Sequence, residues 1–205
     1  MGDARSGLVR IALALAAALS LCCARAAGPM RIPLRWAPTD DIRIPVAAVD
    51  ALSRQAIYVG SFADARQDRG SIGKNTESRI DTKPKDDWLV STPDDVAVFL
   101  SGRFREVLKA NGVPTVASGA TRVIKAEVRR YFVTEGETYQ ADVLLRFTVE
   151  DGAGRTLWQG LAEGHANRWG RSYSEENYQQ SLCNAFLEAT KDVMQNREFL
   201  DAFRT

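Results

Sequence analysis

The stretch that decides the fold reads Thr138-Tyr-Gln-Ala-Asp-Val-Leu-Leu-Arg-Phe-Thr-Val-Glu-Asp-Gly-Ala-Gly154. Every second side chain of its first part is apolar, in the series Tyr139, Ala141, Val143, Leu145, Phe147 and Val149. Successive side chains of a strand point to opposite faces, so strict alternation predicts a strand with one buried face. The run Asp151-Gly152-Ala153-Gly154 then predicts a hairpin turn.

Two further strands are predicted beside this one. Residues 155–166 follow the turn, with Leu157 and Leu161 on one face of the strand. Residues 122–133 precede it. Trp158 and Ala162 belong to the opposite face from Leu157, so the second strand also has two distinct sides.

A helix is predicted upstream of the three strands. Thr92 is a suitable N-cap, Pro93 suits the first turn, and Asp94 and Asp95 complement the positive end of the helix dipole. Asn111-Gly112 is typical of a C-cap. Apolar side chains fall on one face at three- and four-residue spacing, namely Val96, Phe99, Leu100, Phe104, Val107 and Leu108.

A second long helix is predicted downstream of the strands. It starts near Ser172 or Ser174, with Glu175 and Glu176 in its first turn. Its apolar stripe comprises Tyr178, Leu182, Ala185, Phe186, Ala189 and Val193. A short terminal helix that docks on the domain is indicated by Phe199, Leu200 and Phe203.

The order of elements predicts the fold class. A β-branched and aromatic strand covers residues 56–62, and a long polar loop, residues 63–91, connects it to the first helix. The series is therefore strand, loop, helix, three strands and helix. It predicts an α+β fold over residues 55–205, a two-layer α/β sandwich. We expect a mixed or antiparallel sheet of about four to five strands, with both main helices on one face.

The N-terminus predicts export across a bacterial inner membrane. Arg5 and Arg10 precede an uncharged run, residues 11–21, which has the length of the hydrophobic region of a signal peptide. This run is about half of what spans a bilayer. A buried core helix is the alternative, but the run is apolar all round and has no amphipathic face. We therefore interpret residues 1–21 as a signal peptide.

The processing site has two interpretations. Leu19-Ser20-Leu21-Cys22 resembles a lipobox, which implies a diacylglyceryl group and palmitate on Cys22, or on Cys23 as the alternative. Ala24-Arg25-Ala26 instead suits ordinary signal peptidase, which would leave a soluble periplasmic protein. The residue after Cys22 is not Asp, which by the rules of lipoproteins implies the periplasmic face of the outer membrane. Residues 22–54 are predicted to form a tether and an irregular N-terminal arm, because prolines interrupt every helical pattern.

Charge and residue types exclude several functions. The chain has 27 Lys and Arg against 26 Asp and Glu, which is no footprint for nucleic acid. The single histidine, His165, excludes a multi-histidine metal site or a histidine-based triad, and is expected at a surface or edge. We predict no catalytic residues, no metal and no cofactor. Cys183 is predicted as a small buried residue, with a Cys23–Cys183 disulfide as the alternative.

One charged segment is a candidate interaction loop. It comprises Asp64, Arg66, Asp68, Arg69, Ile72 and Gly73. Alternating Asp and Arg favour solvated ion pairs that order the mouth of a loop, and a carboxylate site for hydrolysis is the alternative. Residues 70–75 loosely resemble a phosphate-binding loop, but only two residues separate the glycines where four are needed.

The aromatic side chains of the predicted sheet allow two interpretations. They are Tyr131, Phe132, Tyr139, Trp158 and Trp169. A lipid or peptide groove is one interpretation, and membership of the hydrophobic core is the other and the favoured one.

The order of elements, together with a short motif, resembles a known family. Residues 57–66, reading Ile-Tyr-Val-Gly-Ser-Phe-Ala-Asp-Ala-Arg, are followed by Ile72-Gly73. This strand, Asp-x-Arg and Ile-Gly pattern is similar to small bacterial lipoproteins of the YajG type over residues 56–200. The layout is also similar to auxiliary lipoproteins of ABC-type lipid transport systems and to the N-terminal domain of TolB.

The resemblance implies a cell-envelope protein that binds partners rather than an enzyme. We therefore expect a non-catalytic envelope lipoprotein that acts through contacts with an envelope protein or with lipid. A soluble periplasmic accessory or substrate-binding component of an ABC-type lipid transporter is the alternative.

Overall fold

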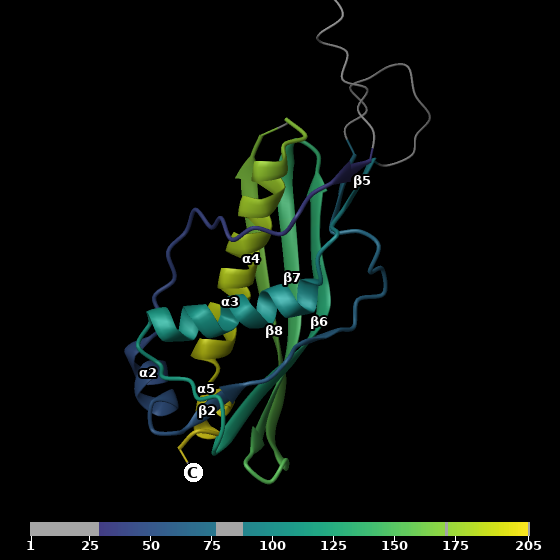
Figure 1. The fold of residues 1–205 in the computed structure, drawn as a ribbon. Helices are drawn as coiled ribbons and strands as arrows, with labels where there is room; N and C mark the ends of the chain where they lie inside the picture. Colours follow the sequence, from purple (N-terminus) through teal and green to yellow (C-terminus); the bar gives the residue numbers. More distant parts are fainter. Residues whose placement is uncertain (1–28, 77–87, 171, 205) are drawn as a thin grey trace, which may run out of the picture.

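Three long antiparallel strands form the centre of the fold. They are β6 (Arg122–Glu135), β7 (Thr138–Asp151) and β8 (Thr156–Trp169). The structure, a computed structural model, describes residues 29–76, 88–170 and 172–204. Every odd-numbered residue of β7 from 139 to 149 is buried and every even-numbered one is partly or fully exposed, which confirms the predicted alternation. The strands stand upright in Figure 1.

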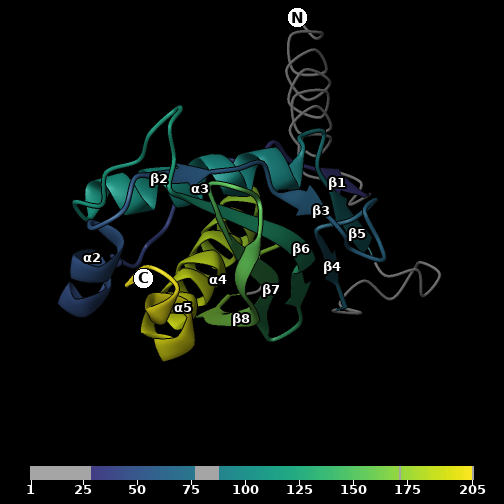
Figure 2. The ribbon, with the colours of Figure 1, turned by 90° about the horizontal axis from the view of Figure 1, so that it is seen from below.

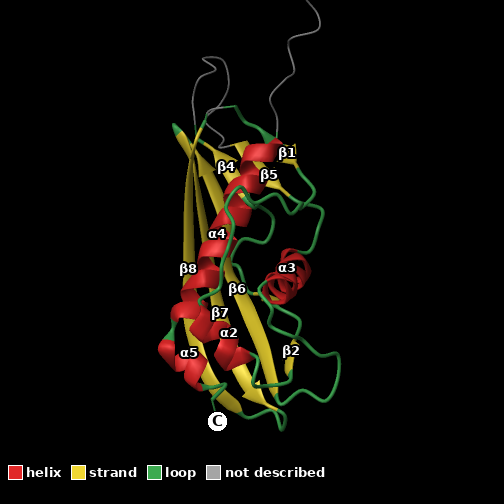
Figure 3. Cartoon of the chain, turned by 90° about the vertical axis from the view of Figure 1, so that its left-hand side faces the viewer, coloured by secondary structure: helices red, strands yellow, loops and turns green. Residues whose placement is uncertain are grey.

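Both main helices cover the same face of these strands, as predicted. Phe147 of β7 lies with its ring centroid 5.2 Å from that of Phe104 in α3 (Val96–Ala110). Four residues earlier on the same face, Val143 pairs with Gly164, which lies against the backbone of α4 (Glu175–Gln195). Figure 3 shows both helices on one side of the sheet, and in Figure 1 α3 crosses the strands while α4 runs along them.

The ends of α3 differ partly from the prediction. The N-cap is Asp95, whose Oδ1 accepts a hydrogen bond from Val98 N at 3.0 Å, and the prediction of Thr92 was wrong. Asp95 can cap because its carboxylate reaches the free backbone N–H groups of the first turn. The predicted end is confirmed: the helix stops at Asn111, and Gly112 follows with a φ of +82°.

The C-terminal helices follow the prediction closely. Ser174 is the N-cap residue of α4, and all six predicted apolar stripe residues are buried. A short helix, α5 (Arg197–Asp201), comes next. The ring of Phe199 in this helix lies 5.2 Å from that of Trp158, so the terminal helix packs on the sheet near the start of β8.

The sheet is larger than expected. It has eight strands within the described residues, so the prediction of four to five was too low. β2 (Ile57–Val59) lies within the strand predicted over residues 56–62. The additional strands come from short segments: β1 (Met30–Arg31), β3 (Ala63–Asp64), β4 (Gly73–Asn75) and β5 (Trp88–Ser91). β2, β3 and β4 pair in parallel with successive parts of β6. The predicted loop therefore contributes three strands, β3, β4 and β5. β3 and β4 supply backbone partners to the free edge of the long β6, and β5 pairs with β4; residues 77–87 lie outside the described residues.

The far edge of the sheet is completed by the start of the described chain. β5 pairs antiparallel with β4, and β1 pairs in parallel with β5. In Figure 2, which looks along the strands, β1, β4 and β5 gather at one side of the sheet and α2 and α5 at the other.

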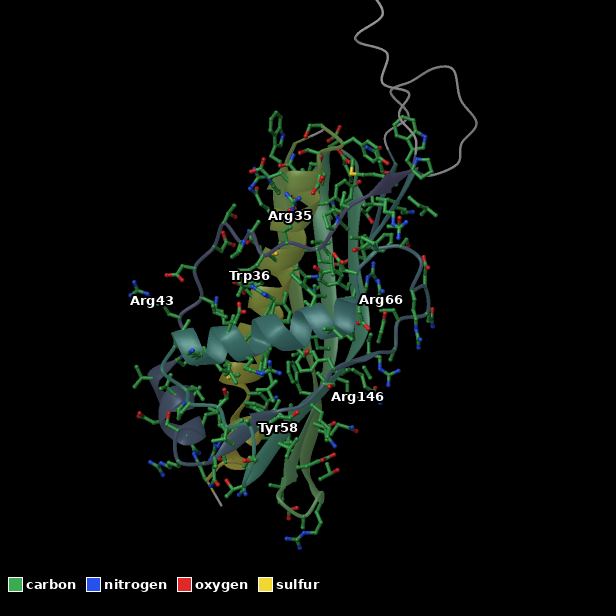
Figure 4. All side chains as sticks on the ribbon, viewed as in Figure 1. Arg35, Trp36, Arg43, Tyr58, Arg66 and Arg146 are labelled. Atoms are coloured by element: carbon green, nitrogen blue, oxygen red, sulfur yellow. The ribbon has the colours of Figure 1, made fainter. Side chains whose placement is uncertain are left out.

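The N-terminal arm packs over the helices. It contains one helix, α2 (Val46–Leu52), which the proline-rich sequence did not predict. Pro45 immediately precedes this helix, where a fixed φ and a missing N–H are tolerated. Trp36 places its ring edge-on to Phe186 of α4 at 6.1 Å (Figure 4). The arm is thus irregular over much of its length, but it belongs to the packed domain.

Cys183 of α4 lies beneath this arm. Its Sγ is 3.4 Å from Arg35 O and 3.5 Å from Ala37 N, and burial raises the pKa of the thiol to about 11. The thiol is buried and free among the described residues, which confirms the predicted buried role; Cys23, the partner in the alternative disulfide, lies outside the described residues.

The close approach at Gly164 generates a stability prediction. A Cβ there would lie 1.9 Å from Ala185 O and 2.3 Å from Ala189 N, so Gly164→Ala must push α4 off the sheet. We expect a loss of about 1–3 kcal/mol or more in the free energy of unfolding, as for other overpacked sites. Urea unfolding of the chain produced without residues 1–23 measures it.

The matched control is Gly102→Ala on α3. No atom lies within 4 Å of the added Cβ, and replacing a glycine inside a helix with alanine stabilises by roughly 0.5–1 kcal/mol. An unchanged unfolding midpoint for Gly164→Ala would contradict the packing described here.

Candidate functional site

The predicted interaction loop lies along the outer edge of β6. Asp64 in β3 pairs with Val128, and Gly73 in β4 pairs with Val133. Between these two contacts residues 65–72 leave the edge of β6 and return to it. The loop thus connects two short strands, β3 and β4, that pair in parallel with the same edge of β6.

The Arg66 side chain joins the two ends of this loop by hydrogen bonds. Its Nε donates to Asp64 Oδ1 at 2.9 Å, one terminal nitrogen donates to Asp64 Oδ2 at 2.8 Å, and the other donates to Ser71 O at 2.9 Å. Arg66 is only 7% exposed. The ion pair does order the mouth of the loop, but the prediction that it is solvated was wrong, since the fork geometry of a guanidinium lets one buried side chain join both ends of the loop (Figure 4).

The pKa of Asp64 reflects these contacts. Partial burial acts to raise it, but the hydrogen bonds and the positive charge of Arg66 more than offset this, with a smaller contribution from Arg69. The pKa is therefore below its ordinary value of 3.8. A carboxylate held in this way is a poor proton donor at neutral pH.

The remaining members of the predicted loop have separate roles. Asp68 accepts a hydrogen bond from Gly70 N at 2.8 Å and another from the Ser71 hydroxyl, which shapes the turn. Ile72 is fully buried, and a Cβ on Gly73 would lie 2.9 Å from Val133 O. Only the tip of the loop, residues 67–70, is exposed. The structure therefore does not bring the six predicted residues together as one surface.

His165 lies on the exposed face of β8, as expected. Its Nδ1 is 2.8 Å from Asp142 Oδ1, and Arg130 forms an ion pair with the other oxygen of the same carboxylate at 3.0 Å. Next to it, a shallow groove of about 320 Å³ is lined by residues of β8 and α4. The lining is mostly charged and comprises Glu163, Gly164, His165, Glu188, Lys191, Asp192 and Gln195. In the described part of the chain, no cluster of three or more His, Cys, Asp or Glu side chains could hold a metal ion.

The aromatic side chains do not form a common groove. Tyr131, Tyr139 and Trp158 are at most 9% exposed and belong to the core, which confirms the favoured interpretation for these three. Phe132 is half-buried on the opposite face of the sheet. Trp169 is 82% exposed, so the core interpretation is wrong for this residue.

Trp169 lies at one end of the sheet, which we call the upper end because it is at the top of Figure 1. A row of paired residues crosses the sheet through Met30, Val90, Gly73, Val133, Ala141 and Ala166. Beyond this row, β6 ends at Glu135 and β8 ends at Trp169. β1 runs parallel to β5, which begins at this same end. The described chain therefore starts at the upper end of the sheet.

Residues before and after Trp169 in the sequence make hydrogen bonds to neighbouring elements. Before it, Arg168 Nε donates to Asn177 Oδ1 of α4 at 3.0 Å. After it, Gly170 has a φ of +151°, which favours glycine, and Ser174 N donates to the Tyr139 hydroxyl at 3.1 Å. The end of β8 is thus tied to the start of α4.

The buried carboxylate of Glu135 stabilises the start of α4, next to the end of β8. Glu135 is fully buried, and its two oxygens accept hydrogen bonds of 2.8 Å from Tyr173 N and from the Tyr178 hydroxyl. Burial, followed by the charge of Glu135, raises the pKa of Tyr178, which keeps this phenol protonated as a donor. Sequence reasoning missed Glu135, although it continues the buried series Tyr131 and Val133 as a polar residue in an apolar position.

Comparison with solved structures identifies the fold. The chain is similar to a Xanthomonas campestris protein of the family DUF330, with a TM-score of 0.51, 12% identity, and coverage of 82% of this chain and 91% of that one. Since the identity is low, this likeness shows a shared fold alone. The TM-score is 0.46 for a candidate lipoprotein from Caulobacter crescentus CB15, at 12% identity, covering 78% of this chain and 95% of the other. PelC from Paraburkholderia phytofirmans, a dodecamer, gives 0.40 at 14% identity, covering 67% and 85%.

At the level of sequence, no protein-family model matches the chain and no curated protein does. In the parts of the chain that the structure describes, none of the helices has the length and apolar character to cross a membrane.

The Arg66–Asp64 pair generates a pH-dependent prediction. Because the folded pKa of Asp64 lies below 3.8, its ionised form stabilises the fold above that pH, and the contribution is lost as the pH falls through the folded pKa. Asp64→Asn should therefore lower the free energy of unfolding by about 1.5–3 kcal/mol at neutral pH. The gap to the unsubstituted chain should shrink as the pH falls from neutrality to below 3.8. Denaturant unfolding at neutral pH and below pH 3.8 measures the two gaps, and equal gaps would contradict a stabilising role for the Asp64 charge.

Proposed function

We propose that this protein is a bacterial cell-envelope lipoprotein without catalytic activity, which acts through contacts with an envelope protein or with lipid. The observation that carries the proposal is the apolar run that ends at Leu21, directly before Cys22, and Cys22 lies only eight residues before β1 begins at Met30. A lipid on Cys22 would attach directly to a folded domain, since the arm after Met30 packs against α4 and is no free linker.

The short spacing limits where the domain can lie. A fully extended chain spans at most about 3.3–3.6 Å per residue, so eight residues reach no farther than roughly 29 Å. An anchor at Cys22 would therefore hold the upper end of the sheet close to the bilayer. We place this bilayer at the periplasmic face of the outer membrane, because the residue after Cys22 is not Asp.

The charge arrangement supports a non-catalytic role. Hydrolysis by paired carboxylates needs a carboxyl group with a raised pKa to act as the acid. Asp64 has a lowered pKa, and both of its oxygens are occupied by Arg66. The exposed tip of the loop, by contrast, offers Asp68 and Arg69 to a partner at the side of the sheet.

Lipid attachment is tested by metabolic labelling with an alkyne analogue of palmitate in the bacterial host. We expect the protein to be labelled in the membrane fraction, and Cys22→Ala to lose the label because the acceptor thiol is gone. Cys23→Ala is the matched control and should keep it.

Two other outcomes of the labelling separate the alternatives. Label that depends on Cys23 would move the anchor by one residue and leave the proposal standing. An unlabelled protein released with the periplasmic fraction would mean cleavage after Ala26, and would favour the soluble accessory of an ABC-type lipid transporter.

The protein contact is tested by in-cell photocrosslinking. A photoreactive amino acid at position 69, on the exposed tip of the loop, should capture an envelope component. Position 109, exposed on α3, is the control and should capture less. Gel analysis of the purified adducts followed by mass spectrometry measures both. Equal background at the two positions would contradict a contact through this loop.

A further inference from the structure

We infer that the upper end of the sheet rests on the lipid bilayer, with the Trp169 side chain inserted at the membrane interface. This inference rests on the proposed lipid anchor and adds a second attachment. The partner is a lipid surface, and the contact is made by a residue of the folded domain.

The first observation is the exposure of Trp169. Its side chain is 82% exposed, although tryptophan is among the largest apolar side chains and is highly buried on average in folded proteins. Tryptophan is also the residue that membrane proteins concentrate at the interface between headgroups and acyl chains, because its ring is apolar and its N–H is polar. Leu89, 48% exposed in β5, is a second apolar side chain close to this end.

The second observation is where the anchored chain joins the domain. β1 begins at the upper end, and the eight residue-to-residue steps from Cys22 to Met30 span at most roughly 29 Å. Five strand spacings of about 4.8 Å separate β1 from β8, so Trp169 lies about 24 Å across the sheet from the attachment. An anchor at one side and a tryptophan at the other would hold this end flat against the bilayer.

The third observation is that residues near Trp169 are hydrogen-bonded to the start of α4. The Arg168 side chain donates to Asn177, and Ser174 N donates to the Tyr139 hydroxyl. The buried Glu135 accepts hydrogen bonds from Tyr173 N and from the Tyr178 hydroxyl. A residue that follows such bonded neighbours loses less conformational freedom on insertion than one on a mobile loop.

Exposure alone would not select Trp169. Val46 is 76% exposed on α2, and Leu157 is 40% exposed near the lower hairpin of β7 and β8. The helix α2 and the hairpin of β7 and β8 lie toward the far end of the molecule from β1, where the short tether would not place a bilayer (Figure 3). The combination of an aromatic side chain, high exposure and closeness to the attachment is found at Trp169.

The test uses the full chain, purified with its lipid and reconstituted into vesicles of phosphatidylethanolamine and phosphatidylglycerol. Half of the samples contain phosphatidylcholine brominated on acyl carbons near the headgroup, since bromine quenches tryptophan fluorescence at close range. We expect quenching in the unsubstituted protein and its loss in Trp169→Phe. This difference isolates Trp169 from Trp36, Trp88 and Trp158.

The matched control is Leu161→Ser. Leu161 is 50% exposed on the same face of the same strand, about 26 Å from Trp169 along β8. We expect this variant to be quenched as much as the unsubstituted protein. Both substituted side chains are exposed, so the melting temperatures should match that of the unsubstituted chain, which circular dichroism measures.

The outcomes separate the inference from the proposed function. A lipidated, vesicle-bound protein whose quenching is absent, or is the same in Trp169→Phe, would overturn the membrane contact and leave the lipoprotein proposal intact. A blue shift that depends on protein concentration without quenching would place Trp169 against a second copy, which also overturns it. A chain without lipid that stays off the vesicles would overturn both.

Discussion

The rest of the structure depends on the contact between the backbone of α4 and β8 at Gly164. The absence of a side chain there lets the helix lie directly on the strand, with Ala185 O inside the volume that a Cβ would fill. This close contact sets the depth of the helical layer. It lets Tyr178, Leu182 and Phe186 reach the buried face of β7, and it brings the start of α4 down to the end of β8. A larger residue at position 164 would move α4 away from the sheet and weaken all of these contacts together.

The N-terminal arm and the upper end both depend on this placement of α4. Trp36 and Ala37 lie along the outer side of the helix, on Phe186 and Cys183, so the arm follows its course. At the start of the helix, Tyr178 meets Glu135 from the end of β6. The arm and β6 thus contact α4 at Phe186, Cys183 and Tyr178. The first described residues of the chain lie at the same end of the sheet as Trp169.

Much of this arrangement could be predicted from local patterns, and what was missed has physical reasons. The alternation in β7 and the helical stripes of α3 and α4 depend on burial, which sequence records directly. β3, β4 and β5 are only two to four residues long, so no periodicity identifies them. β3 and β4 are strands because the 14-residue β6 needs partners along its second edge, and β5 pairs in turn with β4. A break in the pattern of β6, where buried Val128 is followed by Tyr131, marks the irregularity in its pairing with β7.

For the candidate site too, the sequence predicts some contacts but not their burial or their neighbours in space. The pairing of Asp64 with Arg66 follows from their spacing, but its burial depends on how the loop returns to β6 at Ile72 and Gly73. Trp169 shares the exposed phase of β8 with Leu161 and His165, so the alternation that defines the strand already places an aromatic side chain on the open face. The alternation in β8 does not predict which other elements lie near Trp169. Only the register through Met30 shows that it shares one end of the sheet with the start of the domain, and that shared end gives its exposure a functional meaning.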